Sequence, residues 1–180
     1  MRDAITSVHT GVPVRAATRA DVPAILEIYN HAVIHTTASY DLEPVSLESR
    51  LDWYDHKVQD GWPVLVSVNG DDVTGWATFG SFREKPGYRY TAEHSVYVRH
   101  DCRGEGVGQA LMAAVIAEAR TRGLHTLIGG VDADNAGSLA FHEGLGFTRV
   151  AHFRQVGHKF GRWLDLVFLQ LDLGQPTPQQ

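Results

Sequence analysis

Apolar positions recur with two different periods along the chain, and the period indicates where helices and strands lie. Apolar residues at helical spacing predict helices over 22–33, 109–120 and 135–143. Short apolar runs predict seven strands, at 14–17, 64–68, 73–79, 91–99, 126–131, 148–153 and 164–171. With one more helix after the first, the order is strand, two helices, three strands, helix, strand, helix and two strands.

That additional helix is expected to begin near Ser46 and to end at Asp60-Gly61, with a buried stripe of Leu47, Leu51, Tyr54 and Val58. The turn at 69–72 joins an antiparallel pair, and a polar, glycine-rich loop separates the last two strands. These features predict an α/β (α+β) fold with a mixed, mostly antiparallel sheet flanked by helices. We expect one domain over 12–173, between loose tails at 1–11 and 174–180.

Composition narrows the classes of protein that fit this pattern. The chain has 180 residues, 43% of them hydrophobic and 21% charged, which suits one domain with a core. A net charge of −5 argues against nucleic acid as the partner. Apolar runs stay short of the roughly 20 residues that cross a bilayer. The single cysteine, Cys102, cannot form an internal disulfide and suits a reducing compartment, so we expect a cytoplasmic protein.

The segment 103–108 carries the clearest chemical signal, because it places three glycines in five positions between a strand and a helix. Glycines let the backbone approach a ligand closely, and the helix start offers unpaired N–H groups, so the segment predicts a phosphate or pyrophosphate site. A P-loop is set aside because Gln109 follows Gly108. A dinucleotide-binding loop fits poorly, because the glycine spacing differs and the loop lies past mid-chain.

The spacing of Arg103, Gly106 and Gly108 resembles the coenzyme A loop of the GCN5-related N-acetyltransferases. Segment 138–147 is similar to the helix and Leu-Gly-Phe end of that family. Three further segments, 92–98, 157–165 and 36–44, resemble the phosphinothricin and methionine sulfoximine acetyltransferases. The resemblance implies the GNAT fold, acetyl-CoA as cosubstrate, a small amino-acid-like amine as acceptor, and a homodimer.

The resemblance also implies a set of residues that hold acetyl-CoA. The glycine segment would bind the pyrophosphate, an exposed strand edge would pair with the pantetheine arm, and the following strand end would bond that arm. The residues are Val96, Tyr97, Val98, Arg103, Gly104, Glu105, Gly106, Val107, Gly108, Gln109, Asn135 and Ser138.

Acetyl transfer to an amine also needs proton transfer. An α-amine has a reference pKa of roughly 8 and is mostly protonated at neutral pH, so a base must take its proton. Glu93 matches the catalytic acid of the subgroup and is the candidate base. His142 stands where many members of the superfamily have a tyrosine, and we expect it to return a proton to the departing thiolate. Transfer would be direct, within a ternary complex.

An amino-acid substrate also carries a carboxylate, for which arginine is the natural partner. Arg83, Glu84 and Lys85 are the expected substrate-binding loop. Tyr40 would give an apolar face, opposite a wall formed by Glu93, His94 and Ser95. His31 and His35 have metal-like spacing, but a third ligand is not apparent, so we expect no metal. The sequence leaves open another amine (a peptide N-terminus or a polyamine), a non-catalytic acyl-CoA-binding module, and, less readily, an oxidoreductase.

Overall fold

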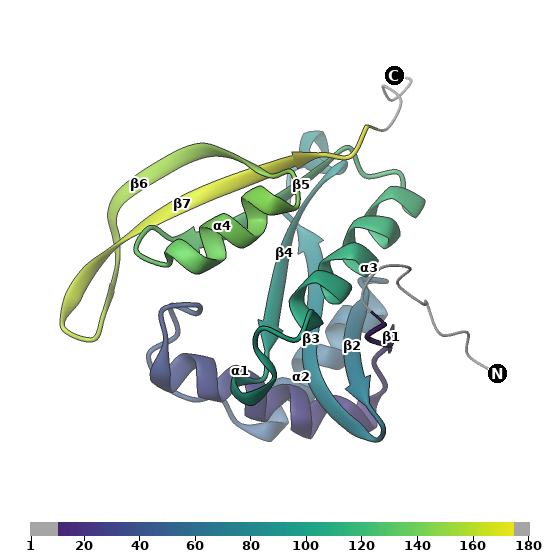
Figure 1. Cartoon of the computed structure of the whole chain (residues 1–180). Helices are drawn as coiled ribbons and strands as arrows, with labels where there is room; N and C mark the ends of the chain where they lie inside the picture. The colour runs from purple at the N-terminus through teal and green to yellow at the C-terminus, as the bar shows by residue number, and fades with distance from the viewer. Residues whose placement is uncertain (1–10, 175–180) are drawn as a thin grey trace.

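The computed structural model describes residues 11–174, so the predicted tails fall almost entirely outside the described residues. The order of elements predicted from the sequence is confirmed (Figure 1). In chain order they are β1 (Val14–Ala16), α1 (Val22–His35), α2 (Leu47–Gln59), β2 (Val64–Asn69), β3 (Asp72–Ser81), β4 (Thr91–Val98), α3 (Val107–Thr121), β5 (Thr126–Asp132), α4 (Ala136–Gly144), β6 (Thr148–Lys159) and β7 (Arg162–Asp172).

The strands form one seven-stranded sheet in the order β1-β2-β3-β4-β5-β7-β6, mostly antiparallel as predicted. The exception is the central pair of β4 and β5, which is parallel. This pairing is short, because residues 91–93 meet 126–128 and the strands then diverge. In Figure 1, β4 continues downward while β7 and β6 swing away to the left. The sheet is therefore split along its middle, and the split positions the site.

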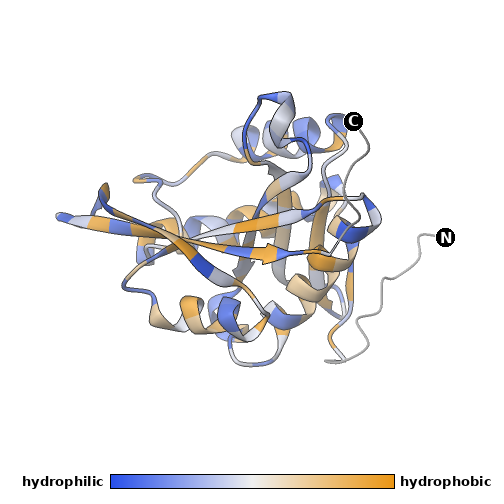
Figure 2. Ribbon diagram, turned by 90° about the horizontal axis from the view of Figure 1, so that it is seen from above, coloured by the Kyte–Doolittle hydropathy of each residue, from blue (hydrophilic) through white to orange (hydrophobic). Residues whose placement is uncertain are grey.

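Helices cover both faces of the sheet, so the strands bury side chains in both directions. Along β2, Leu65 packs into the core under α3, whereas Val64 and Val66 pack into a second core under α1 and α2. This alternation follows from the period of two in a strand. Figure 2 shows the apolar residues concentrated on strands between the helix layers. No helix within residues 11–174 is long and apolar enough to span a bilayer.

The predicted buried stripe of α2 is partly wrong. The helix does begin after Ser46, whose hydroxyl oxygen accepts a hydrogen bond from the Ser49 amide at 3.1 Å. However, its buried residues are Arg50 and Tyr54, while Leu47 and Val58 are 43% and 56% exposed. The helix turns a charged residue inward because aromatic rings beneath it receive the guanidinium.

The predicted polar loop between the last two strands is also wrong. The strands β6 and β7 form one long hairpin that projects from the body of the molecule (Figure 1). Its turn is Phe160-Gly161, with φ of 51° and 72°, which are the left-handed values that a two-residue hairpin turn uses. Pairing continues past Phe153 because irregularities in β6 absorb the extra residues.

One prediction concerns the contact between β3 and α3. A Cβ atom at Gly75 would lie 2.9 Å from the Tyr97 carbonyl oxygen and 2.9 Å from Val107 Cγ1. We expect Gly75→Ala to lower the free energy of unfolding by about 1–3 kcal/mol, because a packed core resists added atoms. The free energy of unfolding is measured by urea denaturation. Gly87→Ala, where a Cβ meets no atom within 4 Å, is the control, and equal stability of both variants would contradict the prediction.

Candidate functional site

The glycine segment forms a turn at the N-terminus of α3. Gly104 and Gly106 have φ of 84° and 82°, a conformation that glycine adopts without strain. Because α3 begins at Val107, its first N–H groups have no carbonyl partner within the helix. They border a cavity of about 620 Å³, here called the cofactor cavity. A turn of this kind at a helix start is suited to a phosphate group.

The structure brings together almost every residue predicted to hold acetyl-CoA. The residues that line the cofactor cavity are Val96, Tyr97, Val98, Arg103, Gly104, Gly106, Val107, Gly108, Gln109, Asn135 and Ser138. Glu105 is exposed and does not line it. Sequence reasoning missed Phe141, whose ring also lines the cavity and would lie 3.3 Å from a Cβ at Gly108. Gly108 therefore serves the close approach of α3 to α4.

The split in the sheet connects the cofactor cavity with a second one. Beyond Glu93, the β5-facing edge of β4 has no strand partner among the described residues. A cavity of about 320 Å³, the acceptor cavity, lies beside this edge, with predicted residues Tyr40, Glu93, His94, Ser95 and His142 in its wall. Both cavities are lined by Val96, Tyr97, Asn135 and Ser138. A long ligand with its reactive end at the split would therefore face a molecule in the acceptor cavity.

The predicted carboxylate-binding loop is not among the residues that line the acceptor cavity. Arg83, Glu84 and Lys85 are exposed and do not line the acceptor cavity. Arg83 lies over the Phe82 ring, 4.9 Å from its centre. Its charge nevertheless acts on Glu93, because it lowers the pKa of that carboxyl group. The loop thus influences the cavity from its rim.

Glu93 lines the acceptor cavity, although the residue is exposed to solvent. Partial desolvation raises the pKa of its carboxyl group, and the Arg83 charge partly offsets that effect. No described residue donates a hydrogen bond to the carboxylate, so its oxygens are available to a ligand. A raised pKa makes the carboxylate a stronger base.

His94 and His142 form a buried pair at the point where β4 and β5 part. His94 Nδ1 donates to the Ile128 carbonyl oxygen at 2.9 Å, and His142 Nδ1 donates to that of Ser138 at 2.7 Å. The two Nε2 atoms are 3.0 Å apart, so a hydrogen bond between them needs a third proton.

Burial opposes that third proton. It lowers the pKa of both rings, and with the neighbouring His142 it brings that of His94 to about 3. The pair is therefore neutral near pH 7, and an imidazolium formed within it is a strong acid. His94 thus joins His142 in one unit, a connection that the sequence did not suggest.

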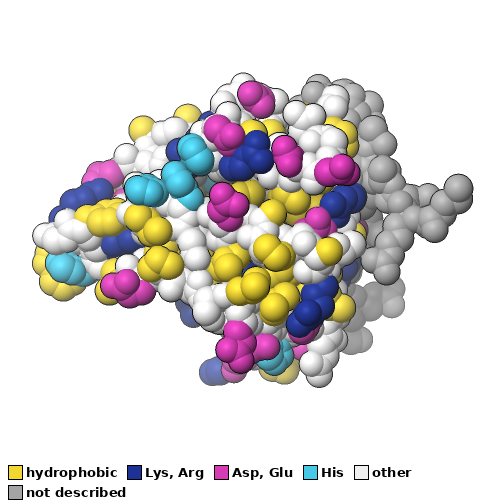
Figure 3. Space-filling model, turned by 90° about the horizontal axis from the view of Figure 1, so that it is seen from below, with side chains coloured by type: hydrophobic (Ala, Val, Ile, Leu, Met, Phe, Trp, Pro, Cys, Tyr) yellow, Lys and Arg dark blue, Asp and Glu magenta, His cyan; other side chains and the backbone are white. Residues whose placement is uncertain are grey.

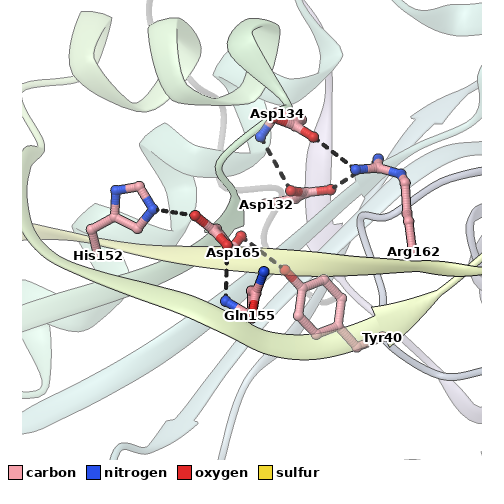
Figure 4. Close-up of polar contacts among 7 residues, drawn as sticks. All are labelled: Tyr40, Asp132, Asp134, His152, Gln155, Arg162 and Asp165. Carbon is pink, nitrogen blue, oxygen red and sulfur yellow. Dashed lines mark hydrogen bonds and ion pairs between the residues drawn. The ribbon is translucent and has the colours of Figure 1, made fainter.

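The hairpin fixes the loop that closes the acceptor cavity. Tyr40 donates through its hydroxyl group to the Asp165 carbonyl oxygen at 3.1 Å (Figure 4). Buried Lys159 donates from Nζ to the Ser39 carbonyl oxygen at 2.7 Å. The Asp165 carboxylate bonds His152 and the Gln155 amide, which holds the irregular part of β6. The sequence assigned no role to Lys159 and Asp165. In the structure, Lys159 holds the loop at Ser39 and Asp165 holds the irregular part of β6.

Asp132 is a member of the acceptor cavity that sequence reasoning missed. It lies at the end of β5, only 4% exposed, and Oδ2 has no hydrogen-bond partner among the described residues. Arg162 is 4.0 Å from this oxygen and also pairs with Asp134 (Figure 4). An acidic residue at a strand end was the available signal.

Histidine clusters elsewhere do not form a metal site. Within residues 11–174, no group of three or more His, Cys, Asp or Glu side chains is arranged to hold a metal ion. His31 lies between His35 and His100, with ring centres 4.5 and 4.2 Å away. The His31 ring stacks on that of His100 and is tilted against that of His35, beside α1.

A prediction tests the charge at the rim. Arg83→Ala removes the group that lowers the pKa of Glu93, so we expect that pKa to rise further above its ordinary value. Titration of the Glu93 carboxyl carbon by NMR measures the change. Arg89→Ala is the control, because Arg89 is an exposed neighbour whose guanidinium lies over Tyr90. An unchanged or lower pKa in the Arg83 variant would contradict the prediction.

Comparison with known proteins gives the family. Residues 14–168 match the family model described as an acetyltransferase (GNAT) domain. A methionine sulfoximine/methionine sulfone acetyltransferase of Salmonella typhimurium is 49% identical over 90% of this chain and 95% of its own length. A Salmonella typhimurium structure solved with acetyl-CoA is 47% identical, with a TM-score of 0.89 over 93% of this chain and 96% of that one.

A further structure, a phosphinothricin acetyltransferase of Sinorhizobium meliloti in complex with acetyl-CoA, is 30% identical, with a TM-score of 0.89 over 94% of this chain and 92% of that one. The glycine turn at the start of α3 and the split between β4 and β5 agree with the family match, which spans residues 14–168. The chain belongs to the GNAT acetyltransferase family and is an N-acetyltransferase.

Proposed function

We propose that the protein transfers the acetyl group of acetyl-CoA to the α-amine of a small amino acid of the methionine sulfone, methionine sulfoximine or phosphinothricin type. The relatives named for these substrates support the class. The observation that carries the chemistry is the Glu93 carboxylate, which has no hydrogen-bond donor among the described residues and lines the acceptor cavity beside the split. A base is needed there because the amine arrives protonated.

The residues present fit acetyl-CoA. The turn at Gly104 and Gly106 and the start of α3 would hold the pyrophosphate, with Arg103 adding charge. The unpaired edge of β4 at 96–98 would bond the amide-rich pantetheine arm as a strand bonds its neighbour. When bound, acetyl-CoA supplies an acyl group activated as a thioester. We infer that the whole arrangement acts mainly by holding this group next to the amine.

Glu93 removes the proton of the bound ammonium group, directly or through a water molecule, so that the nitrogen lone pair is free to attack. Its raised pKa matches this task. His142 is neutral before the reaction, so it first takes up the second proton, which the attacking nitrogen loses as the amide forms, and then returns it to the departing sulfur. Because burial lowers its pKa, the protonated ring gives up its proton readily. The Ser138 carbonyl oxygen positions the His142 ring by accepting a hydrogen bond from Nδ1, and the His94 ring packs beside it.

The central test is Glu93→Gln, assayed by thiol release from acetyl-CoA with a panel of amino acids, peptides and polyamines. We expect kcat for amino acids to fall by about 100- to 10,000-fold, because the general base is lost. The affinity for acetyl-CoA should stay nearly unchanged, since Glu93 does not line the cofactor cavity. Glu48→Gln, an exposed acid on α2, is the matched control.

Other outcomes of this assay would contradict the proposal in different ways. Turnover of peptides or polyamines but not of free amino acids would overturn the substrate class. Tight acetyl-CoA binding without turnover of any amine would indicate a binding module instead. A Glu93→Gln enzyme as active as the parent would remove the proposed base.

We also propose a homodimer, formed through the projecting hairpin. Large apolar side chains are exposed on both of its strands and its turn, including Phe160 at 56% and Trp163 at 61%. Apolar surface is visible on the arm at the left of Figure 3. Surfaces of this kind mark contacts between proteins.

The dimer is tested by sedimentation. Phe160→Glu combined with Trp163→Glu should shift the protein from dimer to monomer, because buried charges would disrupt the interface. Val58→Glu, at an exposed apolar residue of α2, is the control and should leave the dimer intact. A monomeric parent protein would contradict the proposal.

A further inference from the structure

A third cavity, of about 330 Å³, lies between α2 and the sheet and continues from the acceptor cavity. Ser95 and Tyr97 line both. They follow Glu93 on the same face of β4, since side chains on one face recur every second residue. We call this space the side-chain cavity. Its lining is unusual for a protein interior, because it includes two cationic side chains, Arg50 and Lys57.

Arg50 is the central feature of the side-chain cavity. It is 6% exposed, and its guanidinium carbon lies 4.0 Å from the ring centre of Tyr29, 4.7 Å from that of Trp53 and 5.8 Å from that of Trp76. It forms no ion pair with any described residue, and its buried Nε has no hydrogen-bond partner among them. Aromatic faces offset part of the cost of burying a cation, but they leave the Nε donor unused.

Lys57 adds a second donor, two turns further along α2. Its Nζ donates to the Phe79 carbonyl oxygen at 3.0 Å, which uses one of three protons. Gly80 makes room for it, because a Cβ there would lie 2.8 Å from Nζ. One acid, Asp41, also lines the cavity, and its carboxylate accepts a hydrogen bond from the Tyr29 hydroxyl group. The cavity therefore has an excess of positive charge and of hydrogen-bond donors.

The distance between Glu93 and these donors determines which part of a bound substrate can reach them. Ser95 is two residues along the strand, about 7 Å from Glu93 at the usual rise per residue. The α-carboxylate of a substrate is attached to the same carbon as the reacting amine, so it stays near Glu93. A side chain as long as that of methionine extends from that carbon along β4, toward Ser95 and the side-chain cavity.

We propose that the side-chain cavity binds the oxygen-bearing tetrahedral end of the substrate side chain, a sulfone, sulfoximine or phosphinate, through Arg50 and Lys57. These groups present two acceptor atoms, which suits the planar fork of a guanidinium. Plain methionine has a thioether at the same position and offers no strong acceptor. The assignment rests on the proposed function, and it makes Arg50 the residue that selects the oxidised side chain.

The test compares two substrates that differ only in the sulfone oxygens, methionine sulfone and methionine. For the parent enzyme, we expect kcat/KM to be higher for the sulfone. In Arg50→Met, kcat/KM for the sulfone should fall by roughly 10- to 100-fold, as for loss of a charged hydrogen bond. For methionine it should change by less than about threefold, because that substrate makes no bond to Arg50. Lys57→Met should lower the same preference to a smaller extent.

Arg19→Met is the matched control, because Arg19 is exposed and pairs with Asp55 on the surface of α2. Thermal unfolding identifies a variant that fails to fold; Arg50→Lys, which keeps the charge, and Lys57→Met then carry the test. Binding is also followed without turnover, because Trp53 and Trp76 line the cavity and their fluorescence should respond to methionine sulfone.

Three outcomes would overturn the inference: a parent enzyme without preference for the sulfone, an equal loss for both substrates in Arg50→Met, or an unchanged preference in that variant. These differ from failure of the proposed function, in which the parent protein acetylates neither amino acid.

Discussion

The carbonyl oxygen of Ile128 accepts a hydrogen bond from the His94 ring at the point where the pairing of β4 and β5 ends, and both functional cavities lie beside that point. The ring occupies the point where the two parallel strands separate. Gly129 is required beside it, because a Cβ there would lie 2.6 Å from His94 Cε1. The imidazole of His94 therefore fits at the end of this pairing only because residue 129 has no side chain. The edge that remains open is the surface on which the pantetheine arm would lie.

The loop between α1 and α2 is held by contacts from three directions. The Tyr97 hydroxyl group donates to the Ala38 carbonyl oxygen, Lys159 to that of Ser39, and Tyr40 reaches across to β7. Irregular backbone would otherwise be mobile, and a mobile wall would position a small substrate poorly. The buried ammonium of Lys159 is expensive to desolvate, and its place on the hairpin makes that distant element part of the acceptor cavity.

Local signals predicted the order of elements well, and they predicted the glycine turn at a helix start that the structure shows. The glycine segment and the apolar periods are properties of contiguous residues, so they could be recognised without knowing the fold. Positions that depend on which face turns inward could not. Arg50 was missed because a charge in mid-helix ordinarily faces solvent, and only the rings of Tyr29, Trp53 and Trp76, from three separate elements, make its burial tolerable. The role of Arg83 as the carboxylate-binding residue stays a prediction, since its exposed side chain lies outside the lining of the acceptor cavity.

The split keeps the two proposed ligands on different sides of one gap in the sheet. The cofactor cavity lies at the start of α3, the acceptor cavity lies between β4, β5, α4 and the loop at 37–40, and the side-chain cavity lies against α2. On the proposed function, the cosubstrate and the amino acid meet where the first two cavities share lining residues. Coenzyme A and the acetylated amino acid would then leave in different directions, and neither product would block the other.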